Sequence, residues 1–187
     1  MDLTCDEWEQ KVRDWGWPAY RAGQVWEWVY SKLVLSPDGM TNLGKLQREA
    51  LVKSFTFGSA HEISRQISAD GTCKLLLAWP DGATAETVMI PDANRRTACV
   101  SSQVGCPVGC KFCASGIGGA RGNLSAGQIV EQILRSNQIL APAGERITNV
   151  VFMGMGEPLA NYANVIKAVR ILHDPRGLNI GARRITI

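Results

Sequence analysis

The chain has 187 residues, of which 45% are hydrophobic and 20% charged, and its formal net charge at pH 7 is +3. These values are typical of a soluble globular protein, and they permit a nucleic-acid partner without demanding one. The apolar runs are too short to cross a membrane, and acidic residues stand where a secretory signal needs positive charge. We therefore expect a cytoplasmic protein made of one domain, or of one small domain and part of another.

Residues 1–57 predict a small helical unit. Thr4 and Glu7 form a capping box, a second helix is expected at Pro18, and Asn42 is expected to cap a third. Five of the six tryptophans lie in this unit, and their helical spacing favours a hydrophobic core over a platform for stacking nucleic-acid bases. The expected apolar faces contain Trp8, Val12, Trp15, Trp26, Val29, Tyr30, Leu33, Leu43, Leu46, Ala50 and Leu51.

Residues 58–94 predict a meander of short antiparallel strands. After Glu62 the apolar period changes to alternation, and Asp-Gly turns at residues 70–71 and 81–82 separate three strands. Residues 91–94 interrupt this pattern, and we place the boundary with the last region there.

Residues 95–187 predict an α/β fold, because strand and helix patterns alternate along them. The expected strands cover 96–104, 147–153 and 183–187, and the expected helices cover 125–140 and 161–173. Sites in parallel sheets gather at the carboxyl ends of the strands. The loops that follow the first two strands should therefore meet at one edge.

Three cysteines, Cys106, Cys110 and Cys113, stand within eight residues with the spacing C-x3-C-x2-C. Pro107 and Gly109 favour a tight loop that turns the three thiols toward one metal centre. Iron–sulfur clusters are held by cysteine thiolates, usually four, so three would leave one iron open. Structural zinc is the alternative, but no second pair of ligands follows. Three thiols cannot all pair as disulfides.

The cysteine spacing, with the aromatic Phe112 before the last cysteine, resembles the radical S-adenosylmethionine (SAM) superfamily. The wider run from Cys99 to Cys106, and the later run from Met153 to Pro158, resemble those of the ribosomal RNA adenine C2-methyltransferases, which also modify transfer RNA. The resemblance extends from about Leu3 to the last residue. It implies a radical-SAM (β/α) barrel preceded by a helical RNA-binding domain.

The resemblance also assigns cofactor ligands in this chain. Cys106, Cys110 and Cys113 would hold a [4Fe-4S] cluster, whose fourth iron binds the amino and carboxylate groups of SAM. Gly156 and Glu157 would contact the amino group of SAM. Without the resemblance, a Gly-x-Gly-Glu loop after a strand is as readily a simple turn.

Two further residues take catalytic roles from the resemblance. Cys99 would attack a methyl-bearing second cysteine and form a transient disulfide, which releases the methylated RNA. Glu86 would accept a proton. Considered alone, Cys99 is a small buried side chain and Glu86 a solvated carboxylate. Cys5 and Cys73 match no family motif and are expected to be structural.

The implied reaction is a ping-pong. One SAM methylates the second cysteine, and another yields a 5′-deoxyadenosyl radical that activates this methyl group for addition to C2 of adenine. The implied partners are 23S rRNA, tRNA and an electron donor such as flavodoxin, and the expected state is a monomer. Two alternatives stay open: a sister enzyme that methylates adenine C8, and a non-enzymatic metal-binding RNA module.

The chain departs from the family pattern in one respect. The second catalytic cysteine lies near the family's C-terminus, whereas no cysteine follows Cys113 here. Only 91 residues remain from Thr97, and a βαβ unit takes about 30 residues or more. We therefore expect the N-terminal part of a longer enzyme, with an incomplete barrel and no activity of its own.

Overall fold

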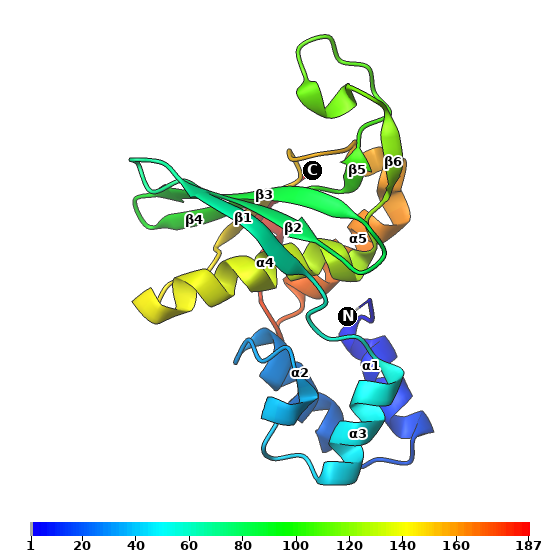
Figure 1. The fold of residues 1–187 in the computed structure, drawn as a ribbon. Coiled ribbons are helices and arrows are strands. Elements are labelled where there is room, and N and C mark those ends of the chain that lie inside the picture. The colour runs from blue at the N-terminus through cyan, green and yellow to red at the C-terminus, as the bar shows by residue number, and fades with distance from the viewer. Residues whose placement is uncertain (1) are drawn as a thin grey trace.

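The computed structural model describes residues 2–187, and Figure 1 shows a helical unit beside a twisted sheet that carries two longer helices. The helical unit contains α1 (Cys5–Asp14), α2 (Tyr20–Tyr30), the short 3-10 helix η1 (Pro37–Gly39) and α3 (Lys45–Ser54). The main sheet contains β1 (His61–Ile67), β2 (Cys73–Ala78), β3 (Thr84–Asp92), β4 (Arg95–Cys99), β7 (Asn149–Val151) and β8 (Ile185–Thr186). The remaining elements are β5 (Gln103–Gly105), η2 (Ala114–Gly116), β6 (Ala120–Asn123), α4 (Ala126–Leu140), η3 (Ala141–Ala143), η4 (Pro158–Asn161), α5 (Tyr162–His173) and η5 (Ala182–Arg184).

The helical unit begins as predicted. The Thr4 side chain accepts from the Glu7 backbone N–H while the Glu7 carboxylate accepts from the Thr4 N–H, which completes the capping box of α1. Asn42 does not cap α3, which begins after Gly44. Its side-chain oxygen instead accepts a hydrogen bond from the Trp28 indole N–H at 2.6 Å. Tertiary contact thus overrides the local capping preference of asparagine.

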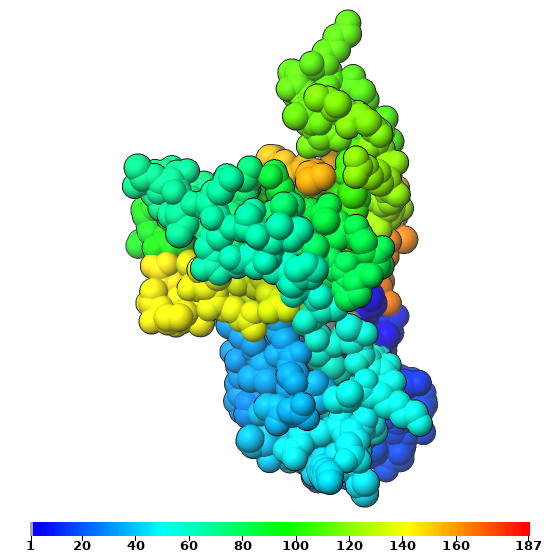
Figure 2. Space-filling model, viewed as in Figure 1, coloured from blue at the N-terminus to red at the C-terminus, as the bar shows by residue number. Residues whose placement is uncertain are grey.

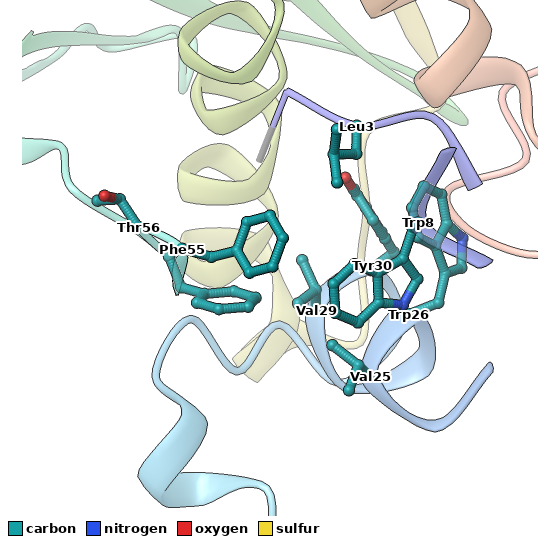
Figure 3. A pocket seen from close by; sticks show the side chains of 9 residues that line it. Leu3, Trp8, Val25, Trp26, Val29, Tyr30, Phe55 and Thr56 are labelled. Carbon is teal, nitrogen blue, oxygen red and sulfur yellow. The ribbon is translucent and has the colours of Figure 1, made fainter. Parts of the chain in front are cut away.

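Two tryptophans of the helical unit lie in its core, as predicted, and Trp15 is partly buried against this core. Trp8 and Trp26 are each 4% exposed, and they line a small apolar cavity with residues of α2 and of the segment after α3 (Figure 3). The Trp8 indole N–H donates to the Ala22 carbonyl at 3.1 Å. The expected place of Leu46 in this core is wrong, because its side chain is 81% exposed.

The main sheet joins the two regions that the sequence separates at residue 94. Its strand order is β1-β2-β3-β4-β7-β8; the pairs from β1 to β4 are antiparallel, and β4–β7 and β7–β8 are parallel. Asp92 of β3 pairs with Arg95 of β4, so residues 93–94 are the turn of a hairpin within one continuous sheet. The parallel pairing expected of the last region is confirmed, and the incomplete (β/α) barrel stays a prediction.

The expected strand over residues 96–104 is wrong in its second half. β4 ends at Cys99, and the chain then enters β5, which pairs with β6 in a separate two-stranded sheet. β6 was not predicted, because its four residues, Ala-Arg-Gly-Asn, show no apolar alternation and are all exposed. The cysteine loop is therefore the long connection of a β-hairpin and does not directly follow a strand of the main sheet.

The helices α4 and α5 cover one face of the main sheet, and the opposite face is open (Figure 1). Along β3 the side chains of Ala85, Thr87 and Met89 are buried, whereas those between them are partly exposed. Parallel sheets in α/β proteins are normally covered on both faces. In the part of the chain that the structure describes, no helix is long and apolar enough to cross a lipid bilayer.

The helical unit is held to the sheet and its helices by ion pairs. Arg176, in the loop after α5, contacts Asp6 and Glu9 of α1 at 2.9 Å each, and Lys167 of α5 contacts Glu7 at 3.0 Å. The Asp2 carboxylate accepts from the Gly127 N–H in the first turn of α4 at 2.6 Å. These contacts fix the orientation of the helical unit.

Candidate active site

Glu86 and Cys99 lie on the open face of the main sheet. Cys99 of β4 pairs with Val88 of β3, and Glu86 stands two residues before Val88, so both side chains project to the same side. Thr87, between them in sequence, points to the opposite side and is fully buried against α4. The sheet therefore brings together the two residues to which the resemblance assigns catalytic roles.

The Glu86 carboxylate is paired with a cation on the neighbouring strand. Its Oε1 lies 2.9 Å from the Nζ of Lys74 on β2, and both side chains are less than half exposed. An exposed pair of this kind contributes only about 0–1 kcal/mol to stability. Its main consequence is that the carboxylate is held over the open face of the sheet.

Cys99 is a half-buried free thiol. Burial raises its pKa above the usual cysteine value, and a hydrogen bond from the Met153 backbone N–H partly offsets this rise in the pKa. Because the thiolate is the nucleophilic form, a raised pKa disfavours the reactive state of Cys99. Cys5 and Cys73 are buried, as expected of structural residues.

The three clustered cysteines lie at the end of the hairpin formed by β5 and β6. We call residues 101–105 and 120–124 the hairpin stem, and residues 106–119 the hairpin tip. The tip projects from the body of the molecule, as Figure 2 shows in green at the top. Cys106 and Cys113 are partly buried and Cys110 is exposed. Within residues 2–187, no three His, Cys, Asp or Glu side chains are gathered closely enough to hold one metal ion.

The donor chemistry of the tip nevertheless suits an iron–sulfur cluster. Hydrogen bonds lower the pKa of Cys113 and favour its thiolate. They come from the backbone N–H and the hydroxyl of Ser115 and, with a smaller effect, from the backbone N–H of Gly116. The hydrogen bonds of the tip are short-range turns, such as Cys113 N–H to the Cys110 carbonyl at 3.1 Å. Drawing the three thiols together would therefore disrupt no packed core.

The loop after β7 packs directly against the hairpin stem. A Cβ atom on Gly154 would lie 2.8 Å from the Val100 carbonyl oxygen, and one on Gly156 would lie 2.7 Å from the Gln103 backbone nitrogen. Gly156 also has a φ of +101°, which favours glycine. Both glycines are thus required by a close approach of two backbones. The Glu157 Oε1 accepts from the Leu159 N–H at 3.0 Å, at the start of η4.

Sequence reasoning missed the buried polar residues that support this edge of the sheet. Beyond the end of β4, the Ser101 N–H donates to Gln132 Oε1 and the Ser101 carbonyl accepts from Gln132 Nε2, each at 2.9 Å. The Thr87 hydroxyl donates to the same Gln132 oxygen. Gln132 therefore satisfies backbone groups that lie beyond the strand pairing. In the sequence, a glutamine among the apolar residues of the expected helix was the sign of a buried polar contact.

Two more amide side chains fix the hairpin stem. Gln103, which is 4% exposed, accepts from the Glu157 N–H and donates to the Asn123 Oδ1, both at 2.8 Å. Asn161, which is 3% exposed, donates to the carbonyls of Ser102 and Leu124 at 2.7 and 2.8 Å. In the sequence, the polar Ser-Ser-Gln stretch at residues 101–103 is what could have indicated an end to the strand, although the resemblance gives this stretch no role.

Comparisons with known proteins agree with this arrangement. Residues 1–56 match the family model described as "Ribosomal RNA large subunit methyltransferase N-terminal domain". The crystal structure of a radical SAM methyltransferase from Sphaerobacter thermophilus superposes with a TM-score of 0.94 at 43% identity, over 98% of this chain and 54% of that one. The fold and the cysteine hairpin are therefore similar to those of a radical SAM methyltransferase.

The curated relatives narrow this class to one family of RNA methyltransferases. A relative from Dictyoglomus thermophilum is 49% identical over the whole chain, and one from Aquifex aeolicus is 47% identical; each is named "Probable dual-specificity RNA methyltransferase RlmN". The chain spans about half the length of these relatives, 53% in both cases. The family resemblance inferred from the sequence is thus confirmed: the chain is similar throughout to RlmN proteins and corresponds to part of their length.

Proposed function

We propose that this chain forms part of the catalytic core of a radical SAM enzyme that methylates C2 of adenine in 23S rRNA and tRNA. The observation that carries the proposal is the convergence of three features at one edge of the sheet. The stem of the cysteine hairpin, the Gly154–Glu157 loop and the open face with Glu86 and Cys99 all meet where β4 and β7 end. Parallel sheets place their sites at this edge.

Cys106, Cys110 and Cys113 would hold a [4Fe-4S] cluster, and Gly156 and Glu157 would receive the amino group of SAM. When bound, these cofactors supply one-electron chemistry that can functionalise a carbon lacking nucleophilic character, such as adenine C2. Gly156 leaves room for a close approach because no side chain projects from it. The Glu157 carboxylate, with one oxygen on the Leu159 N–H, keeps a second oxygen for an ammonium group.

The residues of the open face would act on the RNA side of the reaction. Glu86 would accept the proton that leaves C2, and its contact with Lys74 orients it for this role. Cys99, as its thiolate, would attack the sulfur of the thioether that joins the nucleotide to a second cysteine. The disulfide forms as the carbon–sulfur bond breaks, and the leaving carbon keeps the electron pair and takes up a proton to become the methyl group. No cysteine follows Cys113 in these 187 residues, so we propose that they do not complete the reaction by themselves.

The cellular setting belongs to the same proposal. We propose a cytoplasmic monomer that receives electrons from a protein such as flavodoxin and uses residues 1–57 to contact RNA. All six cysteines are free thiols, which suits a reducing compartment. The division into residues 1–57, 58–94 and 95–187 also stays a prediction, although the main sheet runs through its second boundary.

Cluster binding is tested by anaerobic reconstitution of the chain with iron and sulfide. We expect a brown protein with about four irons per chain and an absorption band that bleaches on reduction. Cys110→Ala should abolish the cluster, whereas the matched control Cys73→Ala, which removes a buried cysteine of β2, should retain it. A colourless protein that contains zinc, or a cluster indifferent to Cys110, would contradict the proposal.

The reaction is tested by methyl transfer from radiolabelled SAM to unmodified ribosomal RNA. The enzyme for this assay is a chimera of the chain with the remaining half of a relative, and the 187-residue chain serves as the control. We expect label at C2 of adenine with the chimera alone, and loss of turnover with Glu86→Gln or Cys99→Ser. Label at C8, or turnover by the 187-residue chain, would refute the corresponding part of the proposal.

A further inference from the structure

We propose that Gln103 is a positioning residue that couples the cysteine hairpin to the Gly154–Glu157 loop, so that the two halves of the cofactor site move as one unit. This inference rests on the proposed function for its biological meaning, but its physical content concerns only contacts within this chain. Gln103 stands three residues before Cys106, at the start of β5.

The side-chain amide of Gln103 uses both ends in directed hydrogen bonds. Its oxygen accepts from the Glu157 backbone N–H, and its nitrogen donates to the Asn123 Oδ1 on the other strand of the stem, each at 2.8 Å. The Gln103 side chain is 4% exposed, whereas Asn123 is an exposed residue of β6, so the bond to the Glu157 N–H is the one that water cannot readily replace. One amide therefore joins β5, β6 and the loop that carries Glu157.

The backbone of the same residue strengthens the connection. The N–H groups of Ser102 and Gln103 both point to the Met155 carbonyl, at 2.8 and 3.2 Å. A Cβ atom on Gly156 would lie 2.6 Å from the Gln103 Cβ, so the loop fits around this side chain with no space to spare. The loop is therefore held against Gln103 both by directed hydrogen bonds and by close packing, which are the two requirements for positioning a site.

The coupling has a chemical consequence for the proposed cofactor site. The cluster would be attached to the hairpin tip, and the amino group of SAM would be bound at the loop. The distance between them is set by whatever joins the two segments. Two side chains of the stem accept hydrogen bonds from this loop: the Ser101 hydroxyl accepts from the Met155 N–H at 2.9 Å, and Gln103 accepts from the N–H of Glu157, the residue proposed to contact SAM. Loss of that bond should therefore alter SAM binding more than cluster binding.

The test compares Gln103→Met with a matched control, Gln138→Met. Methionine keeps the length of the side chain and removes both hydrogen-bonding ends. Gln138 of α4 also uses its amide in full, donating to the Leu33 carbonyl at 2.8 Å and accepting from Arg135 at 3.2 Å. It is partly exposed and lies away from the hairpin, so its variant reports the effect of losing an amide of α4 that makes no contact with the stem.

Hydrogen exchange of the chain without cofactors measures the coupling itself. In Gln103→Met, amides of the stem and of residues 154–160 should exchange about tenfold faster or more, together, because one bridging bond is lost. In Gln138→Met they should be unchanged. Gln103→Glu, which retains an acceptor for the Glu157 N–H, should restore protection of residues 154–160. Equal exchange of these segments in Gln103→Met and Gln138→Met would overturn the inference.

A second measurement uses the reconstituted protein and separates the inference from the proposed function. Gln103→Met should keep its iron content while its Kd for SAM rises about tenfold or more, and Gln138→Met should keep both. If the unsubstituted chain binds no iron or SAM, the proposed function fails while the exchange experiment still decides the coupling. If Gln103→Met binds SAM as tightly as Gln138→Met, the positioning role is wrong.

Discussion

The stem and the tip of the cysteine hairpin are neighbours in sequence but opposite in character. The stem is rooted in a network of buried amides, in which Gln103, Gln132 and Asn161 are each at most 4% exposed. In the tip, Phe112 and Ile117 are 93% and 84% exposed, and the hydrogen bonds are local turns. The fold thus fixes the base of the hairpin, and the proposed cluster would set the final arrangement of the cysteines.

A similar contrast divides the charges of the chain. Residues 1–57 contain seven Lys or Arg against eight Asp or Glu, whereas residues 95–187 contain eleven against four. The positive charge therefore resides in the region with the hairpin and not in the proposed RNA-binding unit. This distribution favours residues 95–187 as the region that would contact phosphate groups. If the helical unit contacts RNA as proposed, its net charge contributes little attraction to the phosphate groups.

The largest effect is expected from Gln132→Met, which tests the buried hydrogen bonds that attach the hairpin stem to α4. The variant leaves the N–H and carbonyl of Ser101 and the Thr87 hydroxyl without their buried partner. Because each such group costs about 1–3 kcal/mol, the free energy of unfolding should fall by about 3 kcal/mol or more. Urea denaturation followed by circular dichroism measures this change. A loss below about 1 kcal/mol would mean that water replaces Gln132 and that the stem is less buried than the structure shows.

A smaller effect is expected from Gly156→Ala, compared with Gly118→Ala in the tip. Both glycines have positive φ, +101° and +91°. A Cβ on Gly156 collides with the Gln103 backbone, whereas one on Gly118 meets nothing within 4 Å. We expect Gly156→Ala to cost about 2–3 kcal/mol, and Gly118→Ala only the conformational strain of about 1–2 kcal/mol. Thermal unfolding of the two variants checks the difference, and equal losses would contradict a packed stem beside a free tip.

The third effect concerns thiol reactivity and its dependence on pH. Hydrogen bonds from Ser115 lower the pKa of Cys113, whereas burial raises the pKa of Cys99 and raises that of Cys5 to about 12. Because the thiolate reacts, Cys113 should be alkylated by iodoacetamide several-fold faster than Cys99 near pH 7, and Cys99 should gain reactivity only as the pH rises further. Peptide mass spectrometry after timed alkylation gives the rates. Faster labelling of Cys99 would show that the open face is more solvated than its burial implies.

The sequence predicted those parts of the molecule that local patterns determine. The capping box at Thr4 starts α1 and the helix expected from residue 125 is present as α4, and the Asp-Gly turns separate the antiparallel strands. It failed where a distant partner decides the outcome. Asn42 bonds the Trp28 indole and does not cap a helix, and the strand through Cys99 ends because the next polar groups are satisfied by α4.

The candidate site divides in the same way. The three cysteines could be singled out by their spacing, because a metal centre requires its ligands close together, whereas the Gly-x-Gly-Glu loop was singled out only through the family resemblance. Gln103 and Asn161 could not be singled out, since their role depends on a carbonyl or an N–H that lies 20 or more residues away. A glutamine in a sequence does not reveal which backbone groups it will satisfy.

The smallest effect is expected from Phe112→Ala at the centre of the tip. The ring is 93% exposed, so it buries almost no apolar surface when the protein folds. The free energy of unfolding should therefore change by less than about 0.5 kcal/mol. The comparison variant Phe55→Ala removes a partly buried ring whose centroid lies 5.3 Å from that of Trp8 in the helical unit, and it should cost about 1–3 kcal/mol. Urea denaturation of both variants without cofactors measures the contrast. A loss of more than about 1 kcal/mol in Phe112→Ala would mean that the ring is packed in solution, and that the tip has a fixed structure before anything binds to it.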